Sequence, residues 1–319
     1  MSRRGKAVGW LIGVVVLALI AAGLVYYLRS LPPTGGDGGG NAEPGNPNNG
    51  PVLMVKIDNI GPARPATGLG SADVIYVEPM EGGLTRIAAV FSEHIPSVVG
   101  PVRSARQTDY DLLAQYGKPT FAYSGAVPQI VRALHSAPLS STLINASQAD
   151  APGAYFRDTS RAAPDNLYLH PEKLTIGTGP TPQAVFSYGA APAGGTVTAD
   201  FPVRYPADSF TFRWTAGAWK VSMDGTPFTS TESGQLSAAT VIVQKVATHP
   251  EPFTEDAQGG ITPVAQTVGT GAATVLRDGQ QFAAAWSRPT AQDGTTFTLV
   301  NGGVLALANG PIWVLLVQA

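Results

Sequence analysis

The chain has 319 residues, contains no cysteine and carries a formal net charge of −2 at pH 7. The lack of cysteine excludes disulfide bonds, a lipid-modified cysteine anchor and thiolate metal sites. The small negative charge argues against a nucleic-acid partner, because binding to nucleic acid requires a basic face. Residues 51–319 are numerous enough to form two domains of ordinary size.

Residues 1–30 predict a cytoplasmic stub followed by one transmembrane helix. Residues 7–28 contain no charged side chain, and at 1.5 Å per residue they span about 33 Å, enough for a hydrocarbon core of about 30 Å. Arg3, Arg4 and Lys6 precede this segment, and basic flanks stay in the cytoplasm. We therefore expect a single-pass protein of the cell membrane whose body lies outside the cytoplasm. A cleaved signal peptide is the alternative, and it would also export the body.

Residues 31–50 predict a disordered linker. The segment is dominated by Gly, Pro and Asn and has no apolar periodicity. Such a composition cannot bury enough apolar surface to offset the entropy lost on ordering. As a flexible coil the linker would span roughly 25 Å and would act as a tether.

Residues 51–188 predict an α/β domain. Apolar runs bounded by turn residues indicate strands, and spaced apolar residues after a capping residue indicate helices. Two of the strands flank Glu-Gly-Gly at 81–83, which predicts a hairpin turn. In chain order we expect strands at 52–57, 72–77 and 85–91, a helix at 108–116, a strand at 119–123, a helix at 128–135 and a strand at 142–145. A layered α/β sandwich accommodates this order.

Residues 189–319 predict a mostly antiparallel, all-β domain, either a sheet or a small barrel. The helical pattern is lost and short strands recur at intervals typical of all-β folds. Asp278-Gly279 is a strong hairpin signal, and the β-branched run 240–246 predicts a central strand. The remaining expected strands are 210–214, 219–223, 274–276, 282–286, 296–300, 304–307 and 312–317.

The sequence does not assign catalytic residues. It has no His-Glu-x-x-His, no phosphate loop ending in Gly-Lys-Ser/Thr and no Gly-x-Ser-x-Gly turn. The four histidines lie far apart and without metal-ligand spacing, so neither a metal nor a cofactor is expected. Gly269-Thr-Gly271 has no helix after it and is predicted to be a loop, not a dinucleotide site.

Arginine is the residue that points to a site. The first domain is rich in arginine and poor in lysine, and Arg103 and Arg106 fall between a predicted strand and a predicted helix, where an open α/β sheet presents its crevice. The guanidinium group suits bidentate recognition of phosphate or carboxylate. Helix amides near Thr108 would add donors. We predict a pocket for an anionic or polar ligand lined by Asp58, Arg64, Glu81, Arg86, Arg103, Ser104, Arg106, Arg161 and Asn166.

Two alternatives stay open at this point. The same arginines lie close in sequence to many carboxylates, so they can instead form structural ion pairs that hold loops together. Two functions other than ligand binding also stay open: a wall-assembly enzyme that handles a phosphate or pyrophosphate substrate, and a non-catalytic scaffold for protein interactions. An exposed Arg/Asp cluster favours a ligand site, whereas fully paired arginines with a large exposed apolar patch favour the scaffold.

Six short motifs occur in order along the first domain: Ile57-Asp-Asn, Ala63-Arg-Pro with Gly68-Leu, Ala72-Asp-Val-Ile-Tyr-Val-Glu, Glu81-Gly-Gly-Leu-Thr-Arg, Gly100-Pro-Val-Arg-Ser-Ala-Arg and Tyr155-Phe-Arg-Asp. Together they resemble the YerB-like family of bacterial envelope lipoproteins, whose biochemical function is unassigned. The resemblance extends from about Val52 to the C-terminus. It implies an envelope location. For a chain in that location we expect the partner to be a wall precursor or another envelope protein.

The chain departs from that family in two places. A transmembrane segment stands in the role of the lipidated cysteine that many members carry. Pro164-Asp-Asn-Leu-Tyr168 stands where members often have Pro-His-Asn-Leu-Tyr. Replacement of a histidine by aspartate argues against a catalytic base at this position.

Overall fold

The computed structural model describes residues 48–255 and 259–319, which belong to one compact unit, Asn46–Ala319. The predicted stub and transmembrane helix of residues 1–30, together with residues 31–47 of the predicted linker, lie outside the described residues. Within the described ranges no helix has the length and apolar character needed to cross a membrane. The predicted linker ends too late in the sequence, because Asn49 and Gly50 already pair with Pro180 and Gly179 in the first strand.

The first half consists mostly of short strands with few helices. The strand predicted at 85–91 has the expected ends, and the helix predicted at 128–135 is one residue shorter. The elements are β1 (Asn49–Ile57), β2 (Val74–Pro79), β3 (Thr85–Phe91), α2 (Asp109–Ala114), β4 (Thr120–Tyr123), α3 (Pro128–Leu134), β5 (Ile144–Ser147), β6 (Tyr155–Arg157), β7 (Leu167–Leu169), β8 (Gly177–Pro180) and α4 (Pro182–Val185).

The second half is built of strands, as predicted. The hairpin at Asp278-Gly279 is confirmed, and both residues have positive φ angles, 51° and 71°. The elements are β9 (Thr196–Val197), β10 (Asp200–Arg204), β11 (Ser209–Thr215), β12 (Ala218–Met223), β13 (Thr226–Pro227), β14 (Thr229–Ser230), β15 (Gly234–Gln235), β16 (Ser237–Ala238), β17 (Thr240–Val246), β18 (Thr248–Pro250), β19 (Pro263–Ala265), β20 (Gly269–Arg277), β21 (Gln280–Arg288), β22 (Thr296–Leu299) and β23 (Ile312–Gln318).

Two local predictions for this half are wrong. Residues 304–307 form only isolated bridges, through Val304 and Leu307, and no strand. The segment predicted as a loop at Gly269–Gly271 is the beginning of β20. Its residues pair along β21, so the ladder extends further than the apolar pattern indicates.

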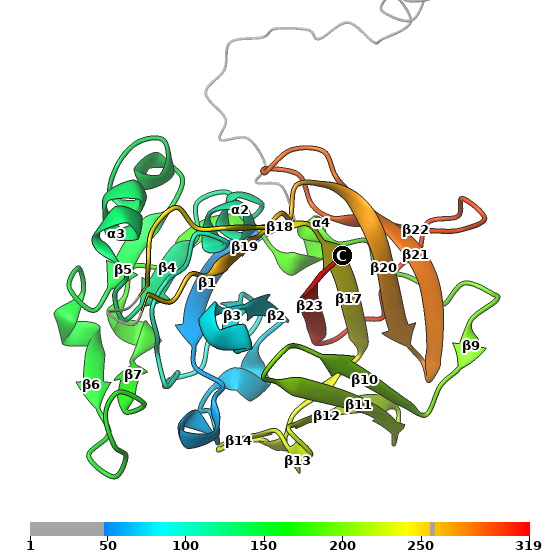
Figure 1. The fold of residues 1–319 in the computed structure, drawn as a ribbon, viewed down its shortest axis with the longest axis horizontal. Coiled ribbons are helices and arrows are strands. Elements are labelled where there is room, and N and C mark those ends of the chain that lie inside the picture. The colour runs from blue at the N-terminus through cyan, green and yellow to red at the C-terminus, as the bar shows by residue number, and fades with distance from the viewer. Residues whose placement is uncertain (1–47, 256–258) are drawn as a thin grey trace, which may run out of the picture. The chain divides into compact units, whose positions relative to one another are not determined.

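A single 12-stranded sheet runs through both halves of the chain (Figure 1). Its main path is β22-β21-β20-β17-β23-β2-β3-β1-β4-β5. The last strand, β23, lies in the middle and pairs in parallel with β17 on one side and with β2 on the other. The expected separate sheet or barrel is therefore corrected: β17 and β20–β22 are antiparallel neighbours, but they continue the sheet of the first half.

The core occupies both faces of this sheet, because successive side chains of a strand point to opposite sides. One face packs against the smaller sheet β10–β13, where Trp313 of β23 contacts the rings of Phe210, Phe212 and Phe228 at centroid distances of 5.9–6.2 Å. The other face packs against α2 and α3 through residues such as Leu112. The long sheet is thus sandwiched between a second sheet and short helices.

Candidate functional site

A polar cavity lies where three parallel strands end. β1 pairs in parallel with β4, and β4 pairs in parallel with β5. The residues that follow these strands are Asp58, Ser124 and Gln148. We call the neighbouring hollow of about 230 Å³ the carboxyl-end cavity, and it is lined by Val102, Arg103, Ser124, Gln148, Arg157, Ala163, Pro164 and Leu167. Open α/β sheets bind ligands outside the carboxyl ends of their strands, so the cavity occupies an expected position for a site.

Arg103 and Asp58 form the central ion pair beside this cavity. Nε of Arg103 donates to Oδ2 of Asp58 at 2.5 Å. The other oxygen of Asp58 accepts backbone N–H groups of Asn59 and Ile60 at 2.9 and 3.3 Å. The Asp58 side chain is buried, whereas that of Arg103 is 25% exposed. The pair therefore fixes the stem of Arg103, and its other guanidinium donors have no partner within residues 48–255 and 259–319, so they are available to a ligand.

Residues 157–167 form the opposite wall. Arg157 donates from Nη1 to Oδ1 of Asn166 at 2.6 Å, and Asn166 also donates to the carbonyl oxygen of Arg161 at 3.3 Å. Arg161 itself donates to the carbonyl oxygens of Ala63 and Pro65 at 3.1 and 2.7 Å. Asn166 and Arg161 thus hold this segment in place, and Arg157 reaches the cavity.

Arg86 is the unusual member of the cluster. Arg86 is the second residue of β3 and pairs with Glu78 of β2. The residue is 7% exposed, and its Nε and Nη1 atoms find no hydrogen-bond partner among the described residues. Burial, followed by the charge of Arg106, lowers the pKa of Arg86 to about 10. Arg103 and Asp58 also act on this group electrostatically. A buried charge that lacks hydrogen-bond partners is energetically costly. The buried charge of Arg86 also adds positive potential beside the Arg103–Asp58 pair.

Asp165 is the second incomplete group in this region. The residue is 7% exposed, and its Oδ1 atom is unpartnered within the described ranges. Burial raises the pKa of Asp165 and the charge of Asp58 adds to this, whereas nearby arginines act in the opposite direction; these are Arg103, Arg86 and Arg161. Asp165, which is not a predicted pocket residue, therefore lies in the same electrostatic environment as the predicted residues Asp58 and Arg103.

Glu81 and Arg106 form a second ion pair, which the other half of the chain completes. Nη2 of Arg106 lies 2.7 Å from Oε1 of Glu81, and Thr262 donates to Oε2 of Glu81 at 2.6 Å. Burial raises the pKa of Glu81, but the Arg106 guanidinium and the Thr262 hydroxyl outweigh it and hold the pKa at about 2. Glu255 adds a third contact, 3.4 Å from Nη1 of Arg106. This pair is occupied by protein groups and offers little to a ligand.

The helix amides near Thr108 do not face the cavity as expected. The N–H of Arg106 donates to Oδ2 of Asp109 at 2.7 Å, and that of Gln107 donates to Oε1 of Glu251 at 3.2 Å. Side chains therefore already satisfy these donors, because α2 begins with an acidic residue and packs against the 251–262 segment. A ligand at this helix end would have to displace them.

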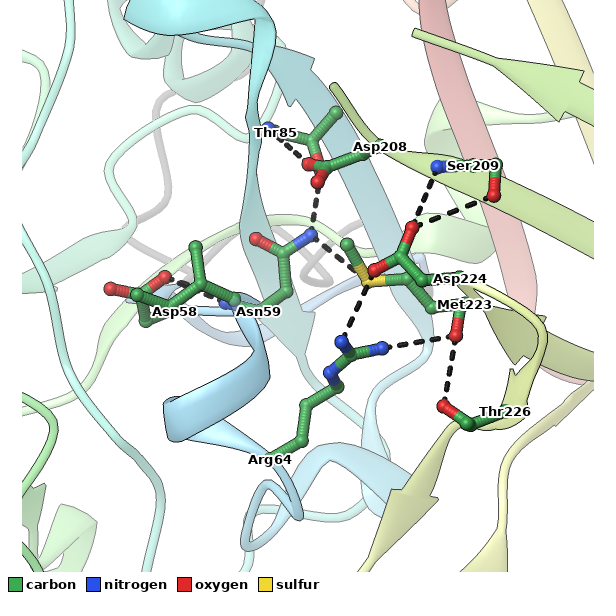
Figure 2. Close-up of polar contacts among 10 residues, drawn as sticks. Asp58, Asn59, Arg64, Thr85, Asp208, Ser209, Met223, Asp224 and Thr226 are labelled. Carbon is green, nitrogen blue, oxygen red and sulfur yellow. Dashed lines mark hydrogen bonds and ion pairs between the residues drawn. The ribbon is translucent and has the colours of Figure 1, made fainter.

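Arg64 is not brought to the cavity. Its guanidinium donates to the carbonyl oxygen of Met223 and to Oδ2 of Asp224, both at 3.1 Å. Figure 2 shows this side chain pointing to Met223 and Asp224 in the second half of the chain, not to Asp58. Its predicted convergence with the other arginines is wrong, because the carboxylate of Asp224, in the second half of the same chain, binds its guanidinium. Ser104 is half-buried beside Arg103, and its hydroxyl forms no hydrogen bond with any described residue.

Several residues near the site are not predicted from the sequence. Arg157, Ser124, Gln148 and Asp165 are absent from the predicted pocket, although Ser124 and Gln148 directly follow strands, the position that favours a site residue. Lys56 is not predicted either: its fully buried ammonium lies 2.7 Å from Glu78 and 2.8 Å from Asp109. The sequence signal for this triad is a single lysine in an apolar strand, with acidic residues near the end of a later strand and at the start of a later helix.

The arrangement favours anion binding over metal binding. The polar side chains lining the carboxyl-end cavity are Arg103, Ser124, Gln148 and Arg157, and all of them can donate hydrogen bonds. No aspartate or glutamate lines it. In the part of the chain that the structure describes, no group of three or more histidines and carboxylates is placed to hold a metal ion.

Comparisons with protein families, characterised sequences and solved structures identify relatives of this chain. Residues 38–181 match the family described as "Protein of unknown function (DUF3048) N-terminal domain", and residues 197–314 match its C-terminal domain; the boundary predicted at 188–189 falls between these matches. A 57-residue stretch is 46% identical to "Putative lipoprotein YerB" of Bacillus subtilis (strain 168), and spans only 18% of this chain and 17% of that protein. The crystal structure of YerB from Bacillus subtilis superimposes with a TM-score of 0.70 at 19% identity, over 85% of this chain and 92% of that one. The chain therefore belongs to the YerB-like family that these two DUF3048 domains define.

Proposed function

We propose that this protein is a cell-envelope protein that binds a small anionic ligand in the carboxyl-end cavity, outside the cytoplasm. The observation that carries the proposal is the convergence of Arg103 and Arg157 on one cavity at the ends of β1, β4 and β5. Among the described residues, each of the two guanidiniums makes one hydrogen-bond contact with the protein and keeps further donors. Ligand recognition by such forks is specific for carboxylate and phosphate groups.

The envelope location rests on two independent supports. The relative YerB is described as a lipoprotein, and residues 7–28 are long and apolar enough for a membrane anchor. A ligand from the envelope, such as a wall precursor or a group on another envelope protein, is then the accessible source of anions. The proposal does not require a chemical reaction, and no catalytic group is assigned.

The test compares Arg103→Lys with the wild-type full-length chain in detergent. The probes are acetate, succinate and inorganic phosphate at constant ionic strength, with binding followed by calorimetry. Lysine keeps the charge but loses the fork, so we expect affinity for the bound anion to fall about tenfold, which corresponds to about 1.4 kcal/mol. Because Arg103 is partly exposed, its replacement by lysine should lower the free energy of unfolding by less than about 1 kcal/mol.

Arg213→Lys is the matched control. Arg213 lies on β11, pairs with Asp200 at 2.6 Å and has a 70% exposed side chain, so its replacement should leave affinity unchanged. Two results would sink the proposal: no binding of any probe to the wild-type chain, or unchanged affinity in Arg103→Lys. A large loss of stability in Arg103→Ala, with unchanged anion affinity of the molecules that remain folded, would leave Arg103 as a structural residue.

A further inference from the structure

The donors around the carboxyl-end cavity outnumber what a carboxylate can accept. Arg103 uses only Nε and Arg157 uses only Nη1 for the protein contacts described above. The side chains of Ser124 and Gln148 make no hydrogen bond within the described ranges and are half-buried. A carboxylate presents two oxygens, whereas a phosphate monoester presents three strong acceptor oxygens. The free donors come from four different side chains around the cavity, which suits a tetrahedral group better than a planar one.

The charge balance of the cluster points the same way. Of the guanidiniums nearest the cavity, only Arg103 forms an ion pair with a described carboxylate, that of Asp58. Arg157 donates to the neutral amide of Asn166, and Nε and Nη1 of Arg86 have no partner among the described residues. Lys56 and Arg106 each already contact two carboxylates. Two guanidiniums beside the cavity are thus left without a direct carboxylate contact, and a phosphate monoester, which carries close to two negative charges at pH 7, can compensate both.

The burial of Arg86 strengthens the electrostatic effect of its positive charge on a bound anion. The side chain is 7% exposed, and two of its nitrogen atoms have no partner in the described part of the chain. Its positive charge is thus poorly screened by solvent, and charges interact more strongly where the effective dielectric constant is low. An anion held by Arg103 gains from this field even without touching Arg86.

From these observations we infer that the ligand of the carboxyl-end cavity is a phosphate monoester, a terminal phosphate group carrying two negative charges. This inference rests on the proposed anion-binding function and narrows its ligand class. The cavity of about 230 Å³ accommodates the phosphate group and a small part of what it is attached to. The same group occurs on soluble metabolites and on the head of a lipid, and both present identical oxygens to the arginines.

The experiment titrates the full-length chain in non-ionic detergent at pH 7.5 and constant ionic strength. The probes are glycerol 3-phosphate, dimethyl phosphate and acetate, which carry two, one and one negative charges. We expect glycerol 3-phosphate to bind at least about tenfold more tightly than either monoanion. Lowering the pH to 5 protonates the monoester, whose second pKa is about 6, and should remove most of this preference.

Variants separate the cavity from general surface charge. Arg157→Gln removes the guanidinium of an exposed residue that lines the cavity, and should abolish the preference for the monoester. Arg86→Met removes the buried charge; we expect it to reduce monoester affinity more than acetate affinity. Arg213→Gln, an exposed arginine on β11, should change neither. Because Arg86→Met can also alter folding, its circular dichroism spectrum is first compared with that of the wild-type chain. If Arg86→Met is unfolded, Arg157→Gln decides the question.

The outcomes distinguish the two levels of the proposal. Equal affinity for all three anions, lost in Arg157→Gln, would overturn the phosphate assignment and leave anion binding intact. Affinities for all three anions that are unchanged in Arg157→Gln, or no binding to the wild-type chain at all, would overturn both. A flotation assay with phosphatidylcholine vesicles, with and without phosphatidic acid, identifies the source: dependence on phosphatidic acid that glycerol 3-phosphate competes away indicates a lipid headgroup, and its absence indicates a soluble phosphate.

Discussion

Lys56 is fully buried on β1, with its ammonium group between the carboxylates of Glu78 on β2 and Asp109 on α2. Oε2 of Glu78 has no partner among the described residues. Burial, together with the charge of Asp109, raises the pKa of Glu78 to about 8, although Lys56 acts against this shift. The three side chains tie two strands to α2, the helix that precedes β4. All three are fully buried and therefore closed to a ligand.

Replacing Lys56 by Met leaves two buried carboxylates without their cation. Breaking a buried ion pair from one side costs about 3–5 kcal/mol, and we expect the free energy of unfolding to fall by that amount. The loss should be smaller at pH 5 than at pH 8, since Glu78 can take up a proton at the lower pH. Urea denaturation measures it, with the exposed Lys245 of β17 replaced by Met as the control. A change below about 1 kcal/mol at pH 8 would contradict this view of the triad.

Glu251 predicts a pH dependence of stability. Burial, and then its contact with Glu255, raise the pKa of Glu251 from its ordinary value of 4.5 to about 8. A carboxyl group whose pKa is higher in the folded state binds more protons there, so stability falls as the pH rises between these two values. We expect Glu251→Gln to lose part of the decline in unfolding free energy that the wild-type chain shows from pH 5 to pH 8. Glu172→Gln, at a side chain that is 57% exposed, should keep the full decline; identical curves for wild type and Glu251→Gln would refute the assignment.

At the scale of elements, β23 is the strand on which the sheet depends. It pairs over seven residues with β17 and over four with β2, and its Trp313 is fully buried against three phenylalanine rings. The strand comes last in the chain but lies at the centre of the sheet, between the two family domains. The halves therefore share one hydrophobic core, and neither completes its sheet without this segment.

Removing residues 311–319 should unfold both halves, not only the second. The truncated chain would expose two unpaired strand edges and lose the Trp313 cluster, where an aromatic-to-alanine change alone costs about 3–5 kcal/mol. Limited proteolysis, with cleavage sites mapped by mass spectrometry, reads out the two halves separately. A protected fragment covering residues 49–180 in the truncated chain would show that the first half folds by itself and that β23 is dispensable to it.

At the scale of the whole molecule, the described body bears the site and the preceding residues bear the predicted anchor. An alkaline phosphatase fused after Ala319 should be active, because this reporter folds only outside the cytoplasm, whereas one fused after Lys6 should be inactive. The mature chain should also keep its N-terminal residues. A mature N-terminus near Gly23 would replace the anchor by a cleaved signal peptide and leave the export of the body unchanged.

Local patterns were enough to locate most elements. The apolar run of β17 and the turn residues between β20 and β21 determine their strands through side-chain burial and backbone preference alone. The arginine-rich composition and the placement of Arg103 after a strand were sufficient to predict a polar crevice. The failure at residues 304–307 has a similar origin: the segment is apolar, but it meets its neighbours only at single bridges, and pairing cannot be read from composition.

The sequence by itself determined most segments of the fold, the hydrogen-bonding chemistry of its arginines and the family motifs, since all of these depend on residues that are near each other in the chain. Only the tertiary structure decided which distant segments meet. It places β23 between β2 and β17, aligns β1 with β4 and β5, turns Arg64 towards Asp224 and leaves Nε and Nη1 of Arg86 without a partner among the described residues. These outcomes depend on strand pairing across long loops and on competition among carboxylates for each guanidinium. Both are settled by the packing of the whole core, because a residue's partners there come from segments that its own neighbours in sequence do not specify.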